Sequence, residues 1–175
     1  MAKTRQASHA SPAYVVDGAR TPFLKARGRP GPFSASDLAV AAGRSLLARQ
    51  PISPEQLDEV ILGCAMPSPD EANIGRVLAL RLGCGHRVPG FTVMRNCASA
   101  MQALDSAVRN IWLGKSDLVL AGGTEAMSRA PILSGTDGFV LSRQTDKYVT
   151  RGDSIAKIVG TEVLAARKGA YLLED

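Results

Sequence analysis

The sequence predicts an α/β fold in which a mainly parallel, mixed sheet carries helices on both faces. Short β-prone runs alternate with segments whose apolar residues recur at helical spacing. Strands separated by helices are typical of right-handed βαβ crossovers, which place successive strands parallel. At 175 residues, with 45% hydrophobic and 21% charged residues, the chain has the composition of one soluble globular domain with a sizeable core.

The first predicted strand covers residues 13–16, the run Ala-Tyr-Val-Val, and Asp17 and Gly18 turn the chain out of it. A helix follows, with Ser34 and Ser36 available as N-caps. One face of this helix is spaced to pack on a sheet and consists of Leu38, Ala41, Ala42, Ser45 and Leu46.

The middle of the chain predicts strands over 59–62 and 91–94 with a helix between them. That helix is expected from about Glu71 to Leu82, with Gly83 as its stop. Its apolar side consists of Ile74, Val77, Leu78 and Leu82.

A strongly amphipathic helix is predicted from Cys97 to about Leu113. A buried strand over 117–121 follows and ends in Gly122 and Gly123. The apolar or small residues of the helix recur at three- and four-residue spacing and are Ala100, Met101, Leu104, Ala107, Val108 and Ile111.

Beyond Pro131 the periodicity weakens, and helical spacing returns only over 154–173. The first residues lack the apolar stretch of a secretory signal and are expected to be disordered. The chain is therefore expected to comprise a disordered terminus over 1–12, an α/β domain over 13–132 and a less regular region over 133–175.

The net charge of +5 does not indicate nucleic-acid binding, because lysine and arginine are spread along the chain without a helix-turn-helix or aromatic signature. No apolar run approaches the roughly 20 residues that span a bilayer. The three cysteines, Cys64, Cys84 and Cys97, lack CxxC spacing, so neither a disulfide framework nor a metal site is predicted. His86 near Cys84 is weak evidence for metal. A reducing cytoplasm fits best.

Cys97 is the candidate nucleophile, because a buried strand turns almost directly into a helix at this residue. The free amides and the positive end of the helix dipole favour a thiolate there, and small residues at 98–100 leave the approach open. A cysteine on an apolar helix face is, however, usually a buried packing residue. The position alone does not decide between these readings.

Four segments, 19–23, 72–76, 96–100 and 121–128, together resemble the thiolase family. The most specific are Asn-Cys-Ala-Ser-Ala around Cys97 and Ala-Gly-Gly-Thr-Glu-Ala-Met-Ser after the last strand. The resemblance covers about residues 13–132 and implies a thiolase-like fold, one half of a layered αβαβα arrangement. One departure is Ala100, where many members have glycine; the added methyl is expected to narrow the acyl pocket.

The resemblance implies that Cys97 takes an acyl group from a CoA thioester. Claisen condensation with acetyl-CoA, or thiolytic cleavage of a 3-ketoacyl-CoA in reverse, passes through this thioester. The family also uses a histidine in a Gly-His-Pro motif and a second cysteine in a Cys-x-Gly motif, and this sequence contains neither. Residues 133–175 then correspond to the start of the family's loop region, and the chain is expected to be an incomplete, inactive portion of the enzyme.

The resemblance further implies acyl-CoA, acetyl-CoA and CoA as partners, no separate cofactor, no nucleic acid, and a homo-oligomer, either dimer or tetramer. Fatty acid metabolism, including β-oxidation, in the cytoplasm is the expected setting. Glu125 and Met127 are candidates for the dimer interface or for the lining of the pocket. No residue is assigned to substrate binding.

Two other interpretations stay open at this point. A ketosynthase-type condensing enzyme shares a cysteine at a strand-to-helix junction, but the segment over 121–128 matches it less well. A truncated, non-catalytic domain of the same fold would bind a partner without turnover.

Overall fold

The computed structural model describes residues 12–26, 30–130, 133–134, 140–142 and 147–149. These residues fall into two units. The described residues of the first unit are 12–22, 35–67 and 71–125. The second unit contains 23–26, 30–34, 68–70, 126–130 and the three short strands that follow.

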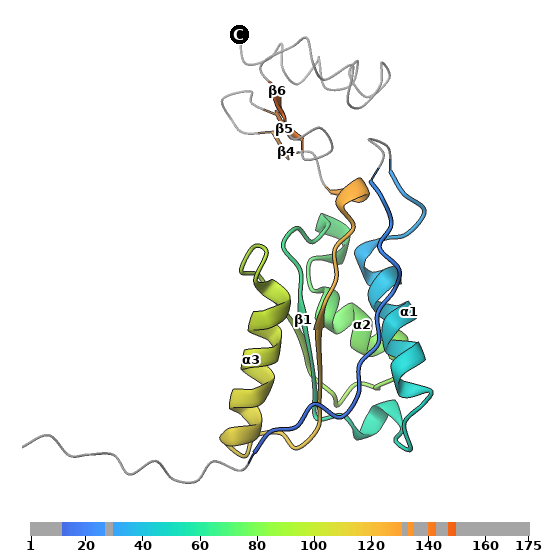
Figure 1. The fold of residues 1–175 in the computed structure, drawn as a ribbon, viewed down its shortest axis with the longest axis vertical. Helices are drawn as coiled ribbons and strands as arrows, with labels where there is room; N and C mark the ends of the chain where they lie inside the picture. The colour runs from blue at the N-terminus through green and yellow to red at the C-terminus, as the bar shows by residue number, and fades with distance from the viewer. Residues whose placement is uncertain (1–11, 27–29, 131–132, 135–139, 143–146, 150–175) are drawn as a thin grey trace, which may run out of the picture. The chain divides into compact units, whose positions relative to one another are not determined.

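The first unit is built on a parallel sheet of β1 (Glu59–Gly63), β2 (Gly90–Val93) and β3 (Val119–Gly123) in the order β2-β1-β3 (Figure 1). Val60 and Ile61 of the central strand are fully buried. A strand buried on both faces is expected where helices cover a parallel sheet on each side. The predicted α/β class with parallel strands is confirmed.

Two helices cover opposite faces of this sheet. α2 (Ile74–Leu82) connects β1 to β2, and α3 (Ser99–Trp112) connects β2 to β3. Because the chain moves outward from β1 to β2 and then back across β1 to β3, right-handed crossovers place the two helices on opposite sides. Figure 1 shows α3 on one side of β1 and α2 on the other.

The first helix, α1 (Ala35–Leu47), packs mainly on α2 rather than on the sheet. The predicted buried face of this helix is wrong. Small residues allow the close approach, since a methyl group placed on Gly43 would lie 2.9 Å from a methyl of Leu82. The residues that are actually buried are Ala35, Ser36, Ala39, Val40, Gly43 and Leu47.

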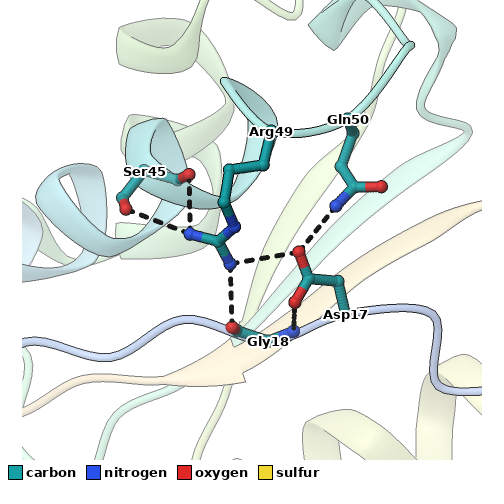
Figure 2. Close-up of polar contacts among 5 residues, drawn as sticks. All are labelled: Asp17, Gly18, Ser45, Arg49 and Gln50. Carbon is teal, nitrogen blue, oxygen red and sulfur yellow. Dashed lines mark hydrogen bonds and ion pairs between the residues drawn. The ribbon is translucent and has the colours of Figure 1, made fainter.

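The strand predicted over 13–16 does not form, and its side chains from Tyr14 to Val16 are at least 77% exposed. Polar contacts hold the following turn instead. Arg49, just after α1, donates to the Asp17 carboxylate and to the Gly18 carbonyl, both at 3.0 Å, and Gln50 donates to Asp17 at 2.6 Å (Figure 2). β propensity alone does not make a strand without a neighbouring strand to exchange hydrogen bonds.

Only Ser99, Ala103 and Ala107 of α3 are buried. The larger apolar residues of the same helix face outward: Met101 is 68% exposed, Trp112 53% and Leu113, its C-cap, 67%. Of the predicted apolar side only Ala107 is buried, while Ala100, Met101 and Leu104 are exposed, so most of that side has no cover within the first unit.

The described residues also contain three short 3-10 helical turns: η1 (Pro54–Gln56), η2 (Pro69–Glu71) and η3 (Met127–Arg129). The second unit also contains an antiparallel sheet of β4 (Leu133–Ser134), β5 (Val140–Ser142) and β6 (Lys147–Val149), which the sequence did not predict. Strands of two or three residues are too short to show a period.

The predicted terminus over 1–12, except residue 12, and the predicted helix over 154–173 lie outside the described residues. Within the described part of the chain, no helix combines the length and the apolar character needed to cross a bilayer.

Candidate functional site

Cys97 lies between the carboxyl end of β2 and the first residue of α3, and it is exposed. The helix was expected from Cys97 to about Leu113, and it runs from Ser99 to Trp112. The predicted position at the amino end of a helix is therefore confirmed to within two residues. That the sulfur faces a cleft stays a prediction.

The other two cysteines are buried, since Cys64 and Cys84 are each 1% exposed. Burial raises the pKa of both thiols, that of Cys64 to about 12. At Cys64 the Glu125 carboxylate adds to the effect of burial by disfavouring a second negative charge. Both residues are thus packing residues, as expected, and neither is available as a thiolate near neutral pH.

A tight turn presents Cys97. Asn96 has a φ of 48°, a left-handed conformation that costs asparagine less than most residues but more than glycine. The Ala98 amide donates to the Arg95 carbonyl at 3.0 Å, and the Ser99 amide donates to the Asn96 carbonyl at 3.1 Å. These bonds bring the chain out of β2 and directly into α3.

The amino end of α3 has no side-chain cap. Its N-cap residue is Ala98, which has no side-chain acceptor for the amides of the first turn. The positive end of the helix dipole is thereby left next to Cys97, where it would stabilise a bound oxyanion.

Two glycines at the ends of neighbouring strands allow α3 to begin so close to the sheet. Gly63 of β1 and Gly123 of β3 lie opposite each other in the parallel register. A methyl group on Gly63 would lie 2.3 Å from the carbonyl carbon of Ser99, and one on Gly123 would lie 2.4 Å from the Ala100 methyl. The Ala100 methyl, where many family members have glycine, therefore sits against Gly123.

Glu125 follows β3 and ties two strand ends together. Its carboxylate accepts a hydrogen bond from the Ala65 amide at 2.9 Å and a weak one from the Cys64 thiol at 3.7 Å. Glu125 therefore has a structural role beside Cys64, in addition to its predicted candidacy as an interface or pocket residue. Met127, the other candidate, begins η3 in the second unit and is 45% exposed.

Sequence reasoning missed three features of this site: the left-handed Asn96, the bonding of the Ser99 hydroxyl, and the carboxylate of Glu125 as an acceptor for Ala65. A signal existed for Asn96, since asparagine between a strand and a helix is a frequent left-handed residue. His86 is exposed in the loop after α2. Among the described residues, no three His, Cys, Asp or Glu side chains are grouped to hold a metal ion.

Comparison with known proteins agrees with this architecture. Residues 13–166 match the family model described as thiolase, N-terminal domain, which extends the resemblance beyond residue 132. The chain is 41% identical over 140 residues to the 3-oxoadipyl-CoA/3-oxo-5,6-dehydrosuberyl-CoA thiolase of Escherichia coli K12, covering 79% of this chain and 35% of that protein. It is also 41% identical over 128 residues to a 3-ketoacyl-CoA thiolase of Idiomarina loihiensis, covering 70% of this chain and 33% of the relative.

Among solved structures, human mitochondrial 3-ketoacyl-CoA thiolase in complex with CoA is similar, with a TM-score of 0.58 and 29% sequence identity. The similarity covers 65% of this chain and 31% of the human chain. The chain thus spans about a third of the length of the relatives it matches. On the family match and the parallel α/β fold, the chain belongs to the thiolase family and corresponds to its amino-terminal domain.

Proposed function

We propose that this chain is the nucleophile-bearing portion of a thiolase-type acyl-CoA acyltransferase, and that Cys97 is the residue that becomes acylated. The observation that carries the proposal is the contrast among the cysteines: Cys97 is exposed at an uncapped helix start, while Cys64 and Cys84 are buried. Relatives that are 41% identical are named thiolases acting on 3-oxoacyl-CoA compounds.

The proposed reaction has two transfers. Cys97 gives its thiol proton to a base, its thiolate attacks the thioester carbonyl of an acyl-CoA, the carbon–sulfur bond to CoA breaks, and the leaving CoA sulfur takes that proton. A base then removes a proton from the methyl group of acetyl-CoA, and the enolate attacks the acyl–Cys97 thioester. This step forms a carbon–carbon bond, breaks the bond to the Cys97 sulfur and returns the removed proton to that sulfur. Thiolytic cleavage of a 3-ketoacyl-CoA is the reverse of these steps.

Each transfer develops negative charge on the thioester oxygen. Backbone N–H groups at a helix start stabilise such charge because they are fixed in place before the reaction. The Cys97 amide, which precedes α3, is the proposed donor in this chain. The resemblance to thiolases implies a histidine and a second cysteine as further groups, and their motifs do not occur in this sequence.

The wider proposal follows the family. Acyl-CoA and CoA are the expected partners, with no separate cofactor, and the enzyme is expected to form homo-oligomers in the cytoplasm. The exposed apolar residues of α3 support association, since Met101 and Trp112 are 68% and 53% exposed. If sedimentation showed the 175-residue chain to be a compact monomer, and this monomer did not bind a hydrophobic dye, the proposed association would be contradicted.

The proposal is tested by labelling the 175-residue chain with iodoacetamide and mapping Cys64, Cys84 and Cys97 by mass spectrometry. Cys97 should label at least about tenfold faster than the two buried thiols, because only exposed thiolates react readily. In a parallel CoA-release assay the chain should show no thiolytic turnover, since losing a catalytic acid–base group typically costs a hundred- to ten-thousand-fold in rate.

Cys97→Ala is the matched control, because it removes the proposed nucleophile and leaves the buried thiols in place. Slower labelling at Cys97 than at Cys64 and Cys84 would contradict the assignment. Turnover that survives Cys97→Ala would contradict it as well.

A further inference from the structure

The hydroxyl of Ser99 closes the turn that carries Cys97. Ser99 Oγ accepts a hydrogen bond from the Arg95 amide at 2.8 Å and donates one to the Asn96 carbonyl at 2.7 Å. These bonds join the backbone on one side of Cys97 to the first residue of α3 on the other side. Ser99 is 4% exposed, so water competes little for its hydroxyl.

The bonds hold a backbone conformation that would otherwise relax. With its φ of 48°, Asn96 pays a conformational cost that must be offset by surrounding contacts. Its carbonyl accepts from both the hydroxyl and the amide of Ser99, which fixes the peptide unit that follows the strained residue. A return of Asn96 to negative φ would break both bonds and move Cys97.

Ser99 is itself fixed to the sheet. Its backbone lies directly over Gly63 at the end of β1, where a methyl group would be 2.3–2.5 Å from the backbone atoms of Ser99 and Ala100. The hydroxyl therefore transmits the position of the sheet to residues 95–96, and through them to Cys97. Ser99 is not the helix cap, because the N-cap is Ala98 and the hydroxyl bonds backward, to residues before the helix.

We propose that Ser99 is a positioning residue for Cys97: its buried hydroxyl holds the left-handed turn at Asn96, and this turn keeps the Cys97 sulfur beside the uncapped start of α3. The inference rests on the proposed role of Cys97 as the nucleophile and deepens it. Ser99 is buried and its hydroxyl bonds only to backbone atoms next to Cys97, so its effect on Cys97 acts through that backbone.

The test compares iodoacetamide labelling of the parent 175-residue chain with Ser99→Ala across a range of pH. In Ser99→Ala, Cys97 should be labelled about three- to tenfold more slowly near neutral pH, because the turn loses both hydrogen bonds of the hydroxyl. The curve of labelling rate against pH should move to higher pH. A merely structural role would change the melting temperature and leave this curve in place.

Two further variants separate the hydroxyl from the fold. Ser99→Thr keeps the hydroxyl and should restore most of the labelling rate at Cys97. Asn96→Gly removes the cost of positive φ, so adding Ser99→Ala to it should slow labelling by only about twofold. The labelling of Cys64 and Cys84 reports whether each variant stays folded.

An unchanged Cys97 rate in folded Ser99→Ala would overturn the inference while leaving Cys97 as the nucleophile. If Ser99→Ala alone unfolds and exposes Cys64 and Cys84, the decisive pair is Asn96→Gly with and without Ser99→Ala, and equal rates in that pair overturn it. If Cys97 labels no faster than the buried thiols in the parent chain, the proposed function fails first.

Discussion

The starts of α2 and α3 are built in opposite ways, although both helices cover the same sheet. At α2, Asn73 accepts from the Arg76 amide at 3.2 Å, and the Thr92 hydroxyl accepts from the Gly75 amide at 3.0 Å. At α3 the N-cap is Ala98, and no side chain in the described part of the chain accepts from the amides of the first helical turn.

The side-chain cap of α2 stabilises the fold, whereas the uncapped start of α3 leaves backbone amides free beside the candidate nucleophile. Asn73 and Thr92 also bond each other, so the capped start of α2 is tied to β2 by side chains. The uncapped start of α3 is held from behind, by the glycines beneath it and by Ser99 reaching back into the preceding turn. Amides that a side-chain cap would bind are thus left next to Cys97, where they would support its proposed acylation.

The largest expected effect comes from the glycines beneath the two starts. A methyl group on Gly75 would lie 2.1 Å from the Phe91 carbonyl oxygen, and one on Gly63 would lie 2.3 Å from Ser99 backbone. Gly75→Ala and Gly63→Ala should each lower the free energy of unfolding by roughly 3 kcal/mol, because backbone atoms must move. Urea denaturation followed by circular dichroism measures both.

Gly18→Ala is the matched control, since nothing lies within 4 Å of a methyl group placed there. It should change the free energy of unfolding by less than about 0.5 kcal/mol. Only Gly63→Ala should also change the labelling rate of Cys97 relative to that of the buried thiols. If the ratio of Cys97 labelling to buried-thiol labelling were equal in Gly63→Ala and Gly75→Ala, the start of α3 would not depend on its close contact with Gly63.

The next largest effect is the pH dependence of the free energy of unfolding that comes from Cys64, just after β1. The pKa of the buried Cys64 thiol is raised from 9.0 to about 12, first by burial and then by Glu125. The pKa of Cys64 is higher in the folded chain than in the unfolded one. The protonated thiol therefore contributes to the free energy of unfolding in full below about pH 9, and this contribution is lost as the pH rises toward 12. The free energy of unfolding should fall by up to about 1.4 kcal/mol per pH unit in that window.

Cys64→Ala is the control for this pH dependence. The substitution removes the titrating thiol, so its free energy of unfolding should fall less steeply above pH 9 than that of the parent. Cys84, whose pKa burial also raises, contributes with the same sign in both chains. Identical slopes for parent and variant would mean that Cys64 ionises as readily in the folded chain as in the unfolded one.

The cap of α2 gives a smaller effect. Asn73→Ala should lower the free energy of unfolding by about 1 kcal/mol, because the Arg76 amide loses its acceptor. Asn73→Asp keeps an acceptor oxygen and should lose less than half of that. Labelling of Cys97 should be the same in both variants, and a change there would show that the two helix starts are coupled.

Much of this architecture follows from sequence pattern. Of the four residues predicted for the apolar side of α2, Ile74, Leu78 and Leu82 are buried and Val77 is half-buried, because helical period and core burial largely agree there. The same reasoning failed for α1, where Gly43 and neighbouring small residues, rather than Leu38 and Leu46, face the partner helix. A prediction from hydrophobicity assigns large apolar side chains to the buried face, but two helices that pack closely need small residues where they meet.

The candidate site divides in the same way. The position of Cys97 at the amino end of a helix could be predicted, because the strand-to-helix junction and the surrounding motif are both readable in the sequence, while its role as nucleophile stays a prediction. The bonds of Ser99 are local but depend on the left-handed turn at Asn96, whereas the pairing of Glu125 with Ala65 depends on which strand ends are neighbours. That information lies in the sheet order β2-β1-β3, which the local pattern of the sequence does not contain.

The smallest expected effect is at Ala98 itself, and it tests why the start of α3 is uncapped. Asparagine at an N-cap usually stabilises by about 1 kcal/mol relative to alanine, but this requires an extended N-cap backbone. Ala98 has φ −94° and ψ 8°, so a side chain there is poorly placed to reach the amides of the first turn. Ala98→Asn should therefore change the free energy of unfolding by less than about 0.5 kcal/mol. An increase of about 1 kcal/mol in the free energy of unfolding, together with slower labelling of Cys97, would contradict this. It would show that the backbone at residue 98 allows a side-chain cap and that α3 is uncapped only because this residue is alanine.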